Sequence, residues 1–235
     1  MGAAVVRAFP GLGARVVSMD VAADAGAAIA GEAGAEFVAA DVSDPGSVTA
    51  AFEAAAGLLG GLDVLVHAAG IAPSSAAEES TAELFRRVLD VNALGTMLAN
   101  QAAFRLMKDA GGTILNFASA AGVAGQKNKS VYSMSKGAVV AWTRTAAKEW
   151  GGYGIRVNMI APAIRTPMYE KTRSEMTPQG LAAHDAGLRA TVLIGGRLGD
   201  PDRDFIPVLA FQSSEGAGFM TGQLIAVDGG ILMAR

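Results

Sequence analysis

Short apolar runs alternate with longer segments of helical period along most of the chain. Most of the short runs are apolar at almost every position, which is typical of parallel strands that are covered on both faces. Strands are predicted at residues 15–19, 36–40, 63–67, 113–117, 156–160 and 223–227, and helices at residues 1–9, 22–32, 45–59, 81–108, 130–149 and 201–212. This alternation predicts an α/β fold: a doubly wound parallel sheet of Rossmann-like type, three layers deep, in a single domain over residues 1–235.

Residues 165–197 depart from this alternation. They contain no clear strand, and they mix polar and charged residues with Pro167, Pro178, Gly180, Gly195 and Gly196. A stretch of this length without a strand is more often a functional lid than a connector. It follows the strand at 156–160, and ligands of parallel α/β sheets lie beyond the carboxyl ends of the strands. We therefore predict a substrate lid at residues 165–197.

Composition narrows the function classes. The chain is 51% hydrophobic and only 17% charged, so it can bury a large core. It has no cysteine, which excludes a thiolate zinc site, an iron–sulfur cluster and a cysteine nucleophile. A net charge of −3 argues against non-specific nucleic-acid binding. No apolar run reaches the ~18 residues of a membrane span, and we expect a soluble cytoplasmic protein with no nucleic-acid or membrane partner.

Tyr132 and Lys136 are candidates for acid–base chemistry. They lie four residues apart near the start of a predicted helix, so both side chains project from one helix face. An unperturbed tyrosine has a pKa near ~10, but a cation about 4–6 Å away stabilises the phenolate and lowers that pKa. The pair can therefore act as an acid–base unit, although the same spacing also arises in helices with no catalytic role.

Ser119 and Asn92 add to this pair. Ser119 follows the predicted strand at 113–117 and precedes Tyr132 by 13 residues. Strand ends and helix starts meet at the ligand edge of such a sheet, so we expect Ser119, Tyr132 and Lys136 to converge there. Asn92 lies in the middle of a predicted helix, where asparagine is unfavourable. It is therefore expected to make a specific bond; the alternative is a helix kink that Asn92 holds.

At these residues the chain resembles the short-chain dehydrogenase/reductase family. The matching segments, in order, are Asp41-Val42, His67-Ala68-Ala69-Gly70, Val91-Asn92, residues 116–122 around Ser119, Tyr132 to Lys136, Arg156-Val157-Asn158 with Pro162 and Thr166, and residues 197–201 and 221–230. Each segment alone is a weak signal. Together, in the right order and over nearly the whole chain, they form a specific pattern.

The resemblance implies a nicotinamide cofactor and a Ser-Tyr-Lys-Asn tetrad. In that tetrad Tyr132 is the general acid/base, and Lys136 lowers the pKa of Tyr132 and holds the nicotinamide ribose. Ser119 hydrogen-bonds the substrate oxygen, and Asn92 anchors a water chain that carries the proton to solvent. The cofactor-binding residues that the resemblance implies are Gly2, Asp41, Val42, Ala68, Ala69, Gly70, Tyr132, Lys136, Pro162, Ile164 and Thr166. No metal site is expected, because the two histidines are too far apart in the chain to form one.

The chain departs from the family pattern in three places. Residues 1–9 resemble only the tail of the family's opening strand–glycine turn–helix unit, with Gly2 as its last glycine, so we expect the native polypeptide to start upstream. His67 stands where asparagine is usual and is expected to be a hydrogen-bonded residue that shapes the cofactor pocket. The loop at 162–166 looks one residue short, which leaves Ile164 and Thr166 as the candidates for cofactor carboxamide contacts.

Asp20 bears on the choice of cofactor. It ends the predicted strand at 15–19, and no lysine or arginine follows it nearby. An acidic side chain at this place can accept hydrogen bonds from the adenosine ribose hydroxyls and repels a 2′-phosphate. The sequence therefore favours NAD over NADP. The alternative is that Asp20 only caps the next helix.

These features lead to one functional hypothesis and two alternatives. The hypothesis is an NAD-dependent oxidoreductase that interconverts a small-molecule secondary alcohol and a ketone. The alternatives are an NADPH-dependent 3-oxoacyl thioester reductase and a non-catalytic binding or scaffold protein. The resemblance also implies a homotetramer built on the long helices at 81–108 and 130–149. Sugar, steroid, terpenoid and acyl substrates all stay open.

Overall fold

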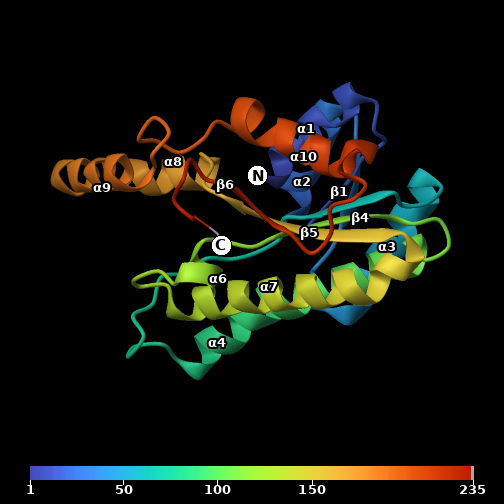
Figure 1. The fold of residues 1–235 in the computed structure, drawn as a ribbon, viewed down its shortest axis with the longest axis horizontal. Helices are drawn as coiled ribbons and strands as arrows, with labels where there is room; N and C mark the ends of the chain where they lie inside the picture. Colours follow the sequence, from blue (N-terminus) through green and yellow to red (C-terminus); the bar gives the residue numbers. More distant parts are fainter. Residues whose placement is uncertain (234–235) are drawn as a thin grey trace.

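The computed structural model describes residues 1–233, apart from the Met168 side chain. Its helices are α1 (Gly2–Ala8), α2 (Ala23–Ala33), α3 (Pro45–Leu59), α4 (Ala82–Leu89), α5 (Gly95–Met107), α6 (Ala121–Ala124), α7 (Ser130–Trp150), α8 (Pro167–Ser174), α9 (Pro178–Thr191) and α10 (Ile206–Ser213). Its strands are β1 (Val17–Asp20), β2 (Glu36–Ala39), β3 (Val64–His67), β4 (Gly112–Phe117), β5 (Ile155–Pro162) and β6 (Leu224–Val227). Strands and helices alternate as predicted (Figure 1).

All strand pairs run parallel, but they form two sheets instead of the expected single one. In the first sheet β1 pairs with β2, and in the second the order is β3-β4-β5-β6. Within residues 1–233, no strand pairs with the second edge of β1 or of β3. The parallel α/β fold is confirmed. The division between the two sheets falls between β1 and β3.

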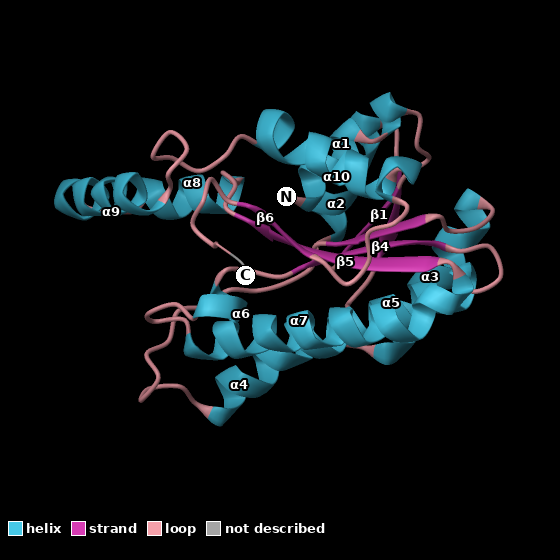
Figure 2. Ribbon diagram, in the orientation of Figure 1, coloured by secondary structure: helices cyan, strands magenta, loops and turns pink. Residues whose placement is uncertain are grey.

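Helices cover both faces of the strands (Figure 2). On one face α3, α5 and α7 pack against β4 and β5 around Phe52, Met107 and Ile114. On the other face α1 and α10 pack against the same two strands around Phe117 and Phe205, whose rings meet edge to face with centroids 5.7 Å apart. Because β4 and β5 are buried from both sides, most of their positions are apolar; the polar ones are Thr113, Asn116, Arg156 and Asn158.

The predicted helix at 81–108 is divided in the structure. Thr81 caps the start of α4 with its side-chain oxygen, and a π-helical turn at Asp90–Leu94 separates α4 from α5. The predicted helix at 201–212 likewise begins with a π-helical turn, Pro201–Phe205, before α10. Single π turns inside helices often occur at functional sites, and the first of these two contains Asn92.

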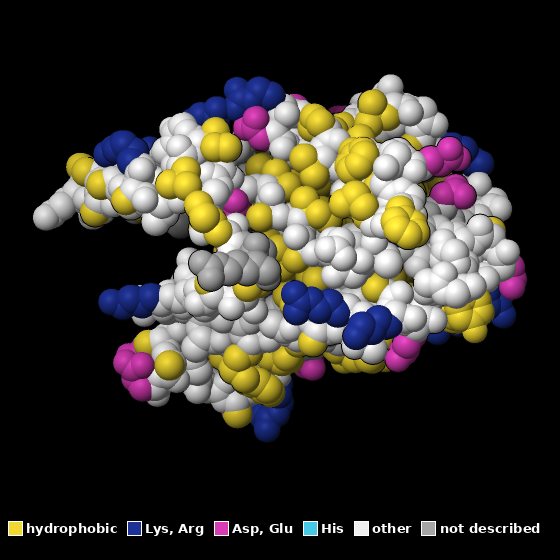
Figure 3. Space-filling model, viewed as in Figure 1, with side chains coloured by type: hydrophobic (Ala, Val, Ile, Leu, Met, Phe, Trp, Pro, Cys, Tyr) yellow, Lys and Arg dark blue, Asp and Glu magenta, His cyan; other side chains and the backbone are white. Residues whose placement is uncertain are grey.

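Residues 165–197 contain two helices that the sequence pattern did not predict. Thr166 caps α8 and Thr177 caps α9, each followed by a proline at the first helical position, where its missing N–H costs nothing. None of the side chains described in α9 is buried, and the helix projects away from the sheet (Figure 1). The space-filling surface is deeply hollowed between these two helices and the end of the molecule that holds α6 (Figure 3).

Candidate active site

Tyr132, Ser119 and Lys136 meet at the carboxyl end of β4. Ser119 lies two residues beyond the strand, and Tyr132 is in the first turn of α7. The Ser119 hydroxyl is close enough to the Tyr132 phenol to lower its pKa. The Lys136 ammonium donates a 2.7 Å hydrogen bond to the carbonyl of Phe117, and it lies 6.0 Å from the centre of the Tyr132 ring. The structure therefore places one hydroxyl, one phenol and one cation together, as the sequence predicts.

Lys136 is a buried cation with unused hydrogen-bonding capacity. Only 6% of the residue is exposed, and burial lowers the pKa of its ammonium from 10.5 to about 8. The group therefore stays mostly charged at pH 7. An ammonium carries three N–H donors, and the described part of the chain supplies one acceptor, the Phe117 carbonyl. Two donors are left for hydroxyl groups of a ligand.

The pKa of Tyr132 moves in the opposite direction to the one expected. Burial raises it above its usual value of 10.0, and the nearby Ser119 hydroxyl offsets only part of that shift. The expected lowering by Lys136 does not appear in this arrangement. A buried neutral phenol is suited to donating a proton, whereas accepting one requires the phenolate to be stabilised further.

Asn92 makes more bonds inside the protein than the water-chain role requires. The residue is fully buried; its Oδ1 accepts from the Ile71 N–H at 2.8 Å, and its Nδ2 donates to the Ile71 carbonyl and to Ser135 Oγ, both at 2.9 Å. Its own carbonyl accepts from the Thr96 hydroxyl at 2.7 Å. Asn92 thus fixes the loop after β3 and the residue that precedes Lys136. This is a positioning role, and it agrees with the alternative that Asn92 holds a helix irregularity.

His67, at the end of β3, is buried with an unpaired ring nitrogen. Its Nε2 has no partner among the described residues, so the expected hydrogen bond is not found at this atom. Burial and the charge of Lys136 lower the pKa of His67 from 6.5 to about 4. The imidazole is therefore neutral at pH 7. An orphaned polar atom this close to Lys136 fits a site that a polar ligand completes.

The His67 pKa predicts an acid-sensitive fold. Between pH 6.5 and 4, His67 is protonated in the unfolded chain and neutral in the folded chain. The free energy of unfolding therefore falls by about 3 kcal/mol as the pH drops through this window. We expect His67→Asn to reduce this dependence of the free energy of unfolding on pH, as measured in urea melts recorded at a series of pH values. His184→Asn, a change of the other histidine, serves as the control and should keep it. An unchanged slope in His67→Asn would contradict the assignment.

Glycine 70 lets the loop after β3 approach the tetrad. A Cβ atom added there would lie 3.1 Å from Asn92 Oδ1 and 3.5 Å from Lys136 Nζ. Ala68 and Ala69 precede it, and a Cβ at Gly2 would lie 3.7 Å from the Cβ of Ala68. The start of α1 and the end of β3 therefore form one small-residue surface beside Lys136, which suits close approach of a cofactor.

Asp20 and Asp41 are both engaged locally. Asp20 Oδ1 accepts from the Ala22 N–H at 2.9 Å, but the N-cap of α2 is Ala22 and no side-chain cap is found there, so Asp20 is not the cap residue of that helix. Asp41 accepts from the N–H and the hydroxyl of Ser43 at 2.9 and 2.6 Å, and these bonds lower its pKa. Val42 packs against α5 at Gly95, where an added Cβ would lie only 2.8 Å from Val42 Cγ2. Asp20 is exposed and can accept further hydrogen bonds through its other oxygen.

The loop after β5 is held by the chain segment at Gly199. Pro162 ends the strand opposite Val227, and Ile164 forms an isolated bridge with Gly199 and is buried in the core. The Thr166 hydroxyl accepts from the Tyr169 N–H at 3.2 Å as the cap of α8. The Ile164 side chain therefore faces the core, and Thr166 keeps one free O–H donor toward a ligand.

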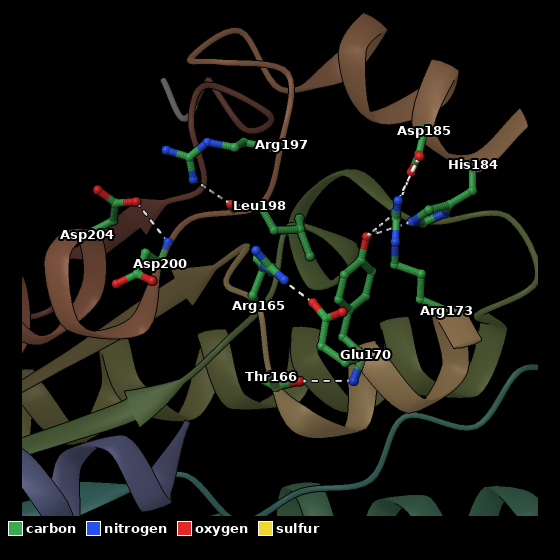
Figure 4. A network of polar contacts seen from close by, with 11 residues as sticks. Arg165, Thr166, Glu170, Arg173, His184, Asp185, Arg197, Leu198, Asp200 and Asp204 are labelled. Atoms are coloured by element: carbon green, nitrogen blue, oxygen red, sulfur yellow. Dashed lines mark hydrogen bonds and ion pairs between the residues drawn. The ribbon is translucent and has the colours of Figure 1, made fainter. Parts of the chain in front are cut away.

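A polar network inside the lid was not predicted. The Tyr169 hydroxyl lies 2.9 Å from His184 Nε2, and Arg173 forms a two-pronged ion pair with Asp185 (Figure 4). Arg165 pairs with Glu170 at 2.8 Å. These contacts tie α8 to α9 and to the end of β5.

Comparison with known proteins decides the family. A family model described as enoyl-(acyl carrier protein) reductase matches residues 1–232. A cis-4-hydroxycyclohexanecarboxylate dehydrogenase of Sinomonas cyclohexanicum is 39% identical over 98% of this chain and 91% of its own length. The chain belongs to the short-chain dehydrogenase/reductase family. It is an oxidoreductase of the short-chain alcohol dehydrogenase type.

Two further members of the short-chain dehydrogenase/reductase family show what the similarity implies about fold and about activity. A crystal structure described as a short-chain alcohol dehydrogenase of Sinorhizobium meliloti has a TM-score of 0.87, at 30% identity, over 99% of this chain and 92% of the other. An inactive 2-(S)-hydroxypropyl-CoM dehydrogenase 2 of Xanthobacter autotrophicus is 35% identical over 98% of this chain and 99% of its own length. Similarity to the family therefore leaves the catalytic residues to be tested directly.

A buried polar network behind the tetrad of this short-chain dehydrogenase/reductase was missed. Asn100 and Asn116 exchange hydrogen bonds of 2.9 and 2.8 Å, Asn116 donates to Thr143, and Trp142 donates to Asn100. Asn116 directly precedes Phe117, whose carbonyl holds Lys136. Asparagine is unfavourable in helices and strands alike, so Asn100 and Asn116 carried the same signal that singled out Asn92.

In residues 1–233 no helix is long and apolar enough to cross a membrane. The same residues contain no group of three or more His, Cys, Asp or Glu side chains that could hold a metal ion.

Proposed function

We propose that this protein is an NAD-dependent oxidoreductase that interconverts a secondary alcohol and a ketone. The observation that carries the proposal is the cluster at the end of β4, where Tyr132 lies beside Ser119 and the buried ammonium of Lys136. Ser119 and Tyr132 bind the substrate oxygen. Tyr132 exchanges a proton with that oxygen, and Lys136 supplies a positive charge beside them. Asn92 positions the loop that faces them.

The residues present fit a nicotinamide cofactor. Lys136 has two N–H donors to offer to ribose hydroxyls, and Gly70 leaves room beside it. When bound, the cofactor supplies or accepts the hydride, and the protein positions it. The other proposed contacts are Gly2, Asp20, Asp41, Val42, Ala68, Ala69, Pro162, Ile164 and Thr166; for Ile164 the contact would be through its backbone, because its side chain is buried.

The proton moves through Tyr132 in both directions of the reaction. In ketone reduction the neutral phenol donates its proton to the substrate oxygen, and the raised pKa of Tyr132 favours this starting state. In alcohol oxidation the substrate hydroxyl loses its proton to the phenolate. Lys136 does not lower the Tyr132 pKa in this arrangement, so this direction requires further stabilisation of the phenolate.

Cofactor preference tests the role of Asp20. Calorimetric titration is expected to show micromolar binding of NAD⁺ and much weaker binding of NADP⁺, because the Asp20 carboxylate repels a 2′-phosphate. Asp20→Asn should narrow the ratio of the two dissociation constants by about fivefold to tenfold. Asp24→Asn, in the first turn of the same α2, is the matched control and should leave the ratio unchanged. Equal binding of both cofactors by the unchanged protein would contradict the assignment.

One alternative is an NADPH-dependent 3-oxoacyl thioester reductase. The description of the matching family model shares the acyl thioester with it but names an enoyl group, in which a C=C bond and not a ketone is reduced. Rates with NADH and NADPH on a β-ketoacyl thioester separate the two functions, because the alternative requires faster turnover with NADPH.

We also propose a homotetramer that uses α4, α5 and α7. Trp142 and Trp150 do not supply this surface: Trp142 donates to Asn100, and Trp150 stacks on Phe104 with centroids 4.9 Å apart within the chain's own core. Phe85 on α4 and Met134 on α7 are exposed apolar candidates. Light scattering is expected to give four times the chain mass of 23.8 kDa; a particle of 23.8 kDa would refute the tetramer.

A further inference from the structure

The lid contains a pocket that is richer in arginine than the acid–base site requires. It has a volume of about 260 Å³, and its charged lining consists of Arg165, Glu170, Arg173, Asp185, Arg189 and Arg197. Figure 4 shows Arg165, Glu170, Arg173, Asp185 and Arg197 in this part of the lid. Four arginines face two carboxylates there, so the lining carries two excess positive charges. A concave site with an excess of one charge attracts ligands of the opposite charge.

Two of these arginines are already paired. Arg173 holds Asp185 with both arms of its guanidinium, and Arg165 holds Glu170. Both carboxylates of the pocket lining are thereby used. The pairs join α8, α9 and the end of β5, so they build the frame of the pocket.

Arg189 and Arg197 carry the excess charge. Neither has a carboxylate within 4.0 Å in the part of the chain that the structure describes. Arg189 acts on Asp185, and Arg197 on Asp204, only as a more distant positive charge. Each of these carboxylates already forms an ion pair with another arginine. The one hydrogen bond of Arg197 goes from Nη1 to the Leu198 carbonyl at 3.2 Å, so most donors of the two guanidinium groups are unused.

A glycine pair holds these two side chains at the pocket. Gly195 and Gly196 have φ values of 74° and 59°, in the left-handed region that favours glycine. A Cβ at Gly196 would lie 3.0 Å from Arg189 Cγ, and one at Gly195 would lie 3.7 Å from Arg197 Nε. The turn therefore brings its backbone close to both arginine side chains, and a side chain at Gly196 would crowd Arg189.

The pocket is built on the segment that directly follows β5 and that also carries Thr166, a proposed cofactor contact. Arg165 directly follows Ile164, and Thr166 caps the helix that carries Tyr169 and Arg173. The Tyr169 ring, Leu188 and Leu198 add apolar surface beside the charges. A small molecule with an apolar body and a charged end matches this lining.

We propose that this pocket binds an oxyanion, a carboxylate or a phosphate, at the end of the substrate away from its hydroxyl group. That this ligand is the substrate rests on the proposed function. The binding test does not rest on it, because the test uses neither cofactor nor turnover. Arg189 and Arg197 make charge-assisted hydrogen bonds to the anion, for which the planar guanidinium fork is well suited. The substrate is then a small hydroxy acid or a hydroxylated phosphate ester, and neutral alcohols bind less tightly.

Calorimetry with three probes tests the pocket without cofactor or turnover. Cyclohexanecarboxylate, cyclohexyl phosphate and the neutral cyclohexanecarboxamide share one ring and differ in the charged end. At least one anion is expected to bind about tenfold or more tightly than the amide, and which anion binds best distinguishes a carboxylic acid from a phosphate ester. Equal affinity for all three probes, or no binding of either anion, would overturn the proposal.

Matched variants assign the effect to the two arginines. Arg189→Gln and Arg197→Gln should each weaken anion binding about tenfold to a hundredfold and leave amide binding unchanged, and Arg189→Lys should recover part of the loss. Arg105→Gln, which removes an exposed arginine of α5, should change nothing. Unchanged anion affinity in both glutamine variants would also overturn the proposal. Oxidation of neutral cyclohexanol, followed separately, reports on the proposed function alone.

Discussion

Tyr132→Phe is expected to lower kcat by about a thousandfold or more. The substitution removes the hydroxyl that, in the proposed function, exchanges a proton with the substrate oxygen, and a positioned acid or base contributes about 10²–10⁴-fold to a rate. The ring stays in place, since phenylalanine fills the same partly buried site beside Ser119. Steady-state rates with a saturating alcohol and NAD⁺ provide the measurement.

The control for this variant separates lost chemistry from lost structure. Thermal melts of Tyr132→Phe should stay close to those of the unchanged protein, because the ring is kept and the interaction of the hydroxyl with Ser119 is worth no more than about 1 kcal/mol. Tyr153→Phe, at an exposed residue that packs edge-on against Phe104, should keep full activity. A Tyr132→Phe protein that retains most of its rate would show that another group carries the proton.

Lys136→Met is expected to abolish turnover and to stabilise the protein. The buried ammonium has a pKa of about 8 in place of 10.5, so holding it charged at pH 7 costs about 3 kcal/mol. Methionine fills a similar volume without the charge, but it leaves the Phe117 carbonyl without its donor, which costs about 1 kcal/mol. The net expectation is a gain of about 1–3 kcal/mol in the free energy of unfolding at pH 7, measured in urea.

The pH dependence of the gain from Lys136→Met gives an independent check. Between pH 8 and 10.5 the unfolded chain holds a proton at Lys136 that the folded chain releases, so the stability of the unchanged protein rises through this window. The advantage of Lys136→Met should therefore shrink as the pH rises. Lys148→Met, at an exposed lysine of the same α7, should alter stability by no more than about 0.5 kcal/mol. A destabilised Lys136→Met protein would contradict this account of the buried charge.

Hydrophobic periodicity was sufficient to predict the strands but not the lid helices. β4 and β5 are buried on both faces, so their continuous apolar runs placed them within two residues of the observed bounds. None of the described α9 side chains is buried, so this helix has no apolar stripe for a periodicity argument to detect. The threonine caps before Pro167 and Pro178 were the available signals for α8 and α9, and they were not used.

The candidate site was predictable where spacing alone brings residues together. The four-residue step from Tyr132 to Lys136 and the strand end before Ser119 follow from backbone geometry. The direction of the Tyr132 pKa could not be predicted, because it depends on how deeply α7 is buried against the sheet. The bonds that Asn92 makes to Ile71 and Ser135 depend on the π-helical turn at Asp90–Leu94. No residue pattern in the sequence predicted that turn.

The most direct test of the central claim is whether the protein produces NADH from a secondary alcohol. Purified protein with NAD⁺ would be offered a cyclic hydroxy acid, a sugar alcohol, a hydroxysteroid and a terpenoid alcohol, and the absorbance of NADH would be followed beside a Tyr132→Phe sample. The account predicts NADH and an equal amount of ketone from at least one alcohol, and none above background in the variant. Protein that binds NAD⁺ but forms no more NADH than the Tyr132→Phe sample with every alcohol would contradict it.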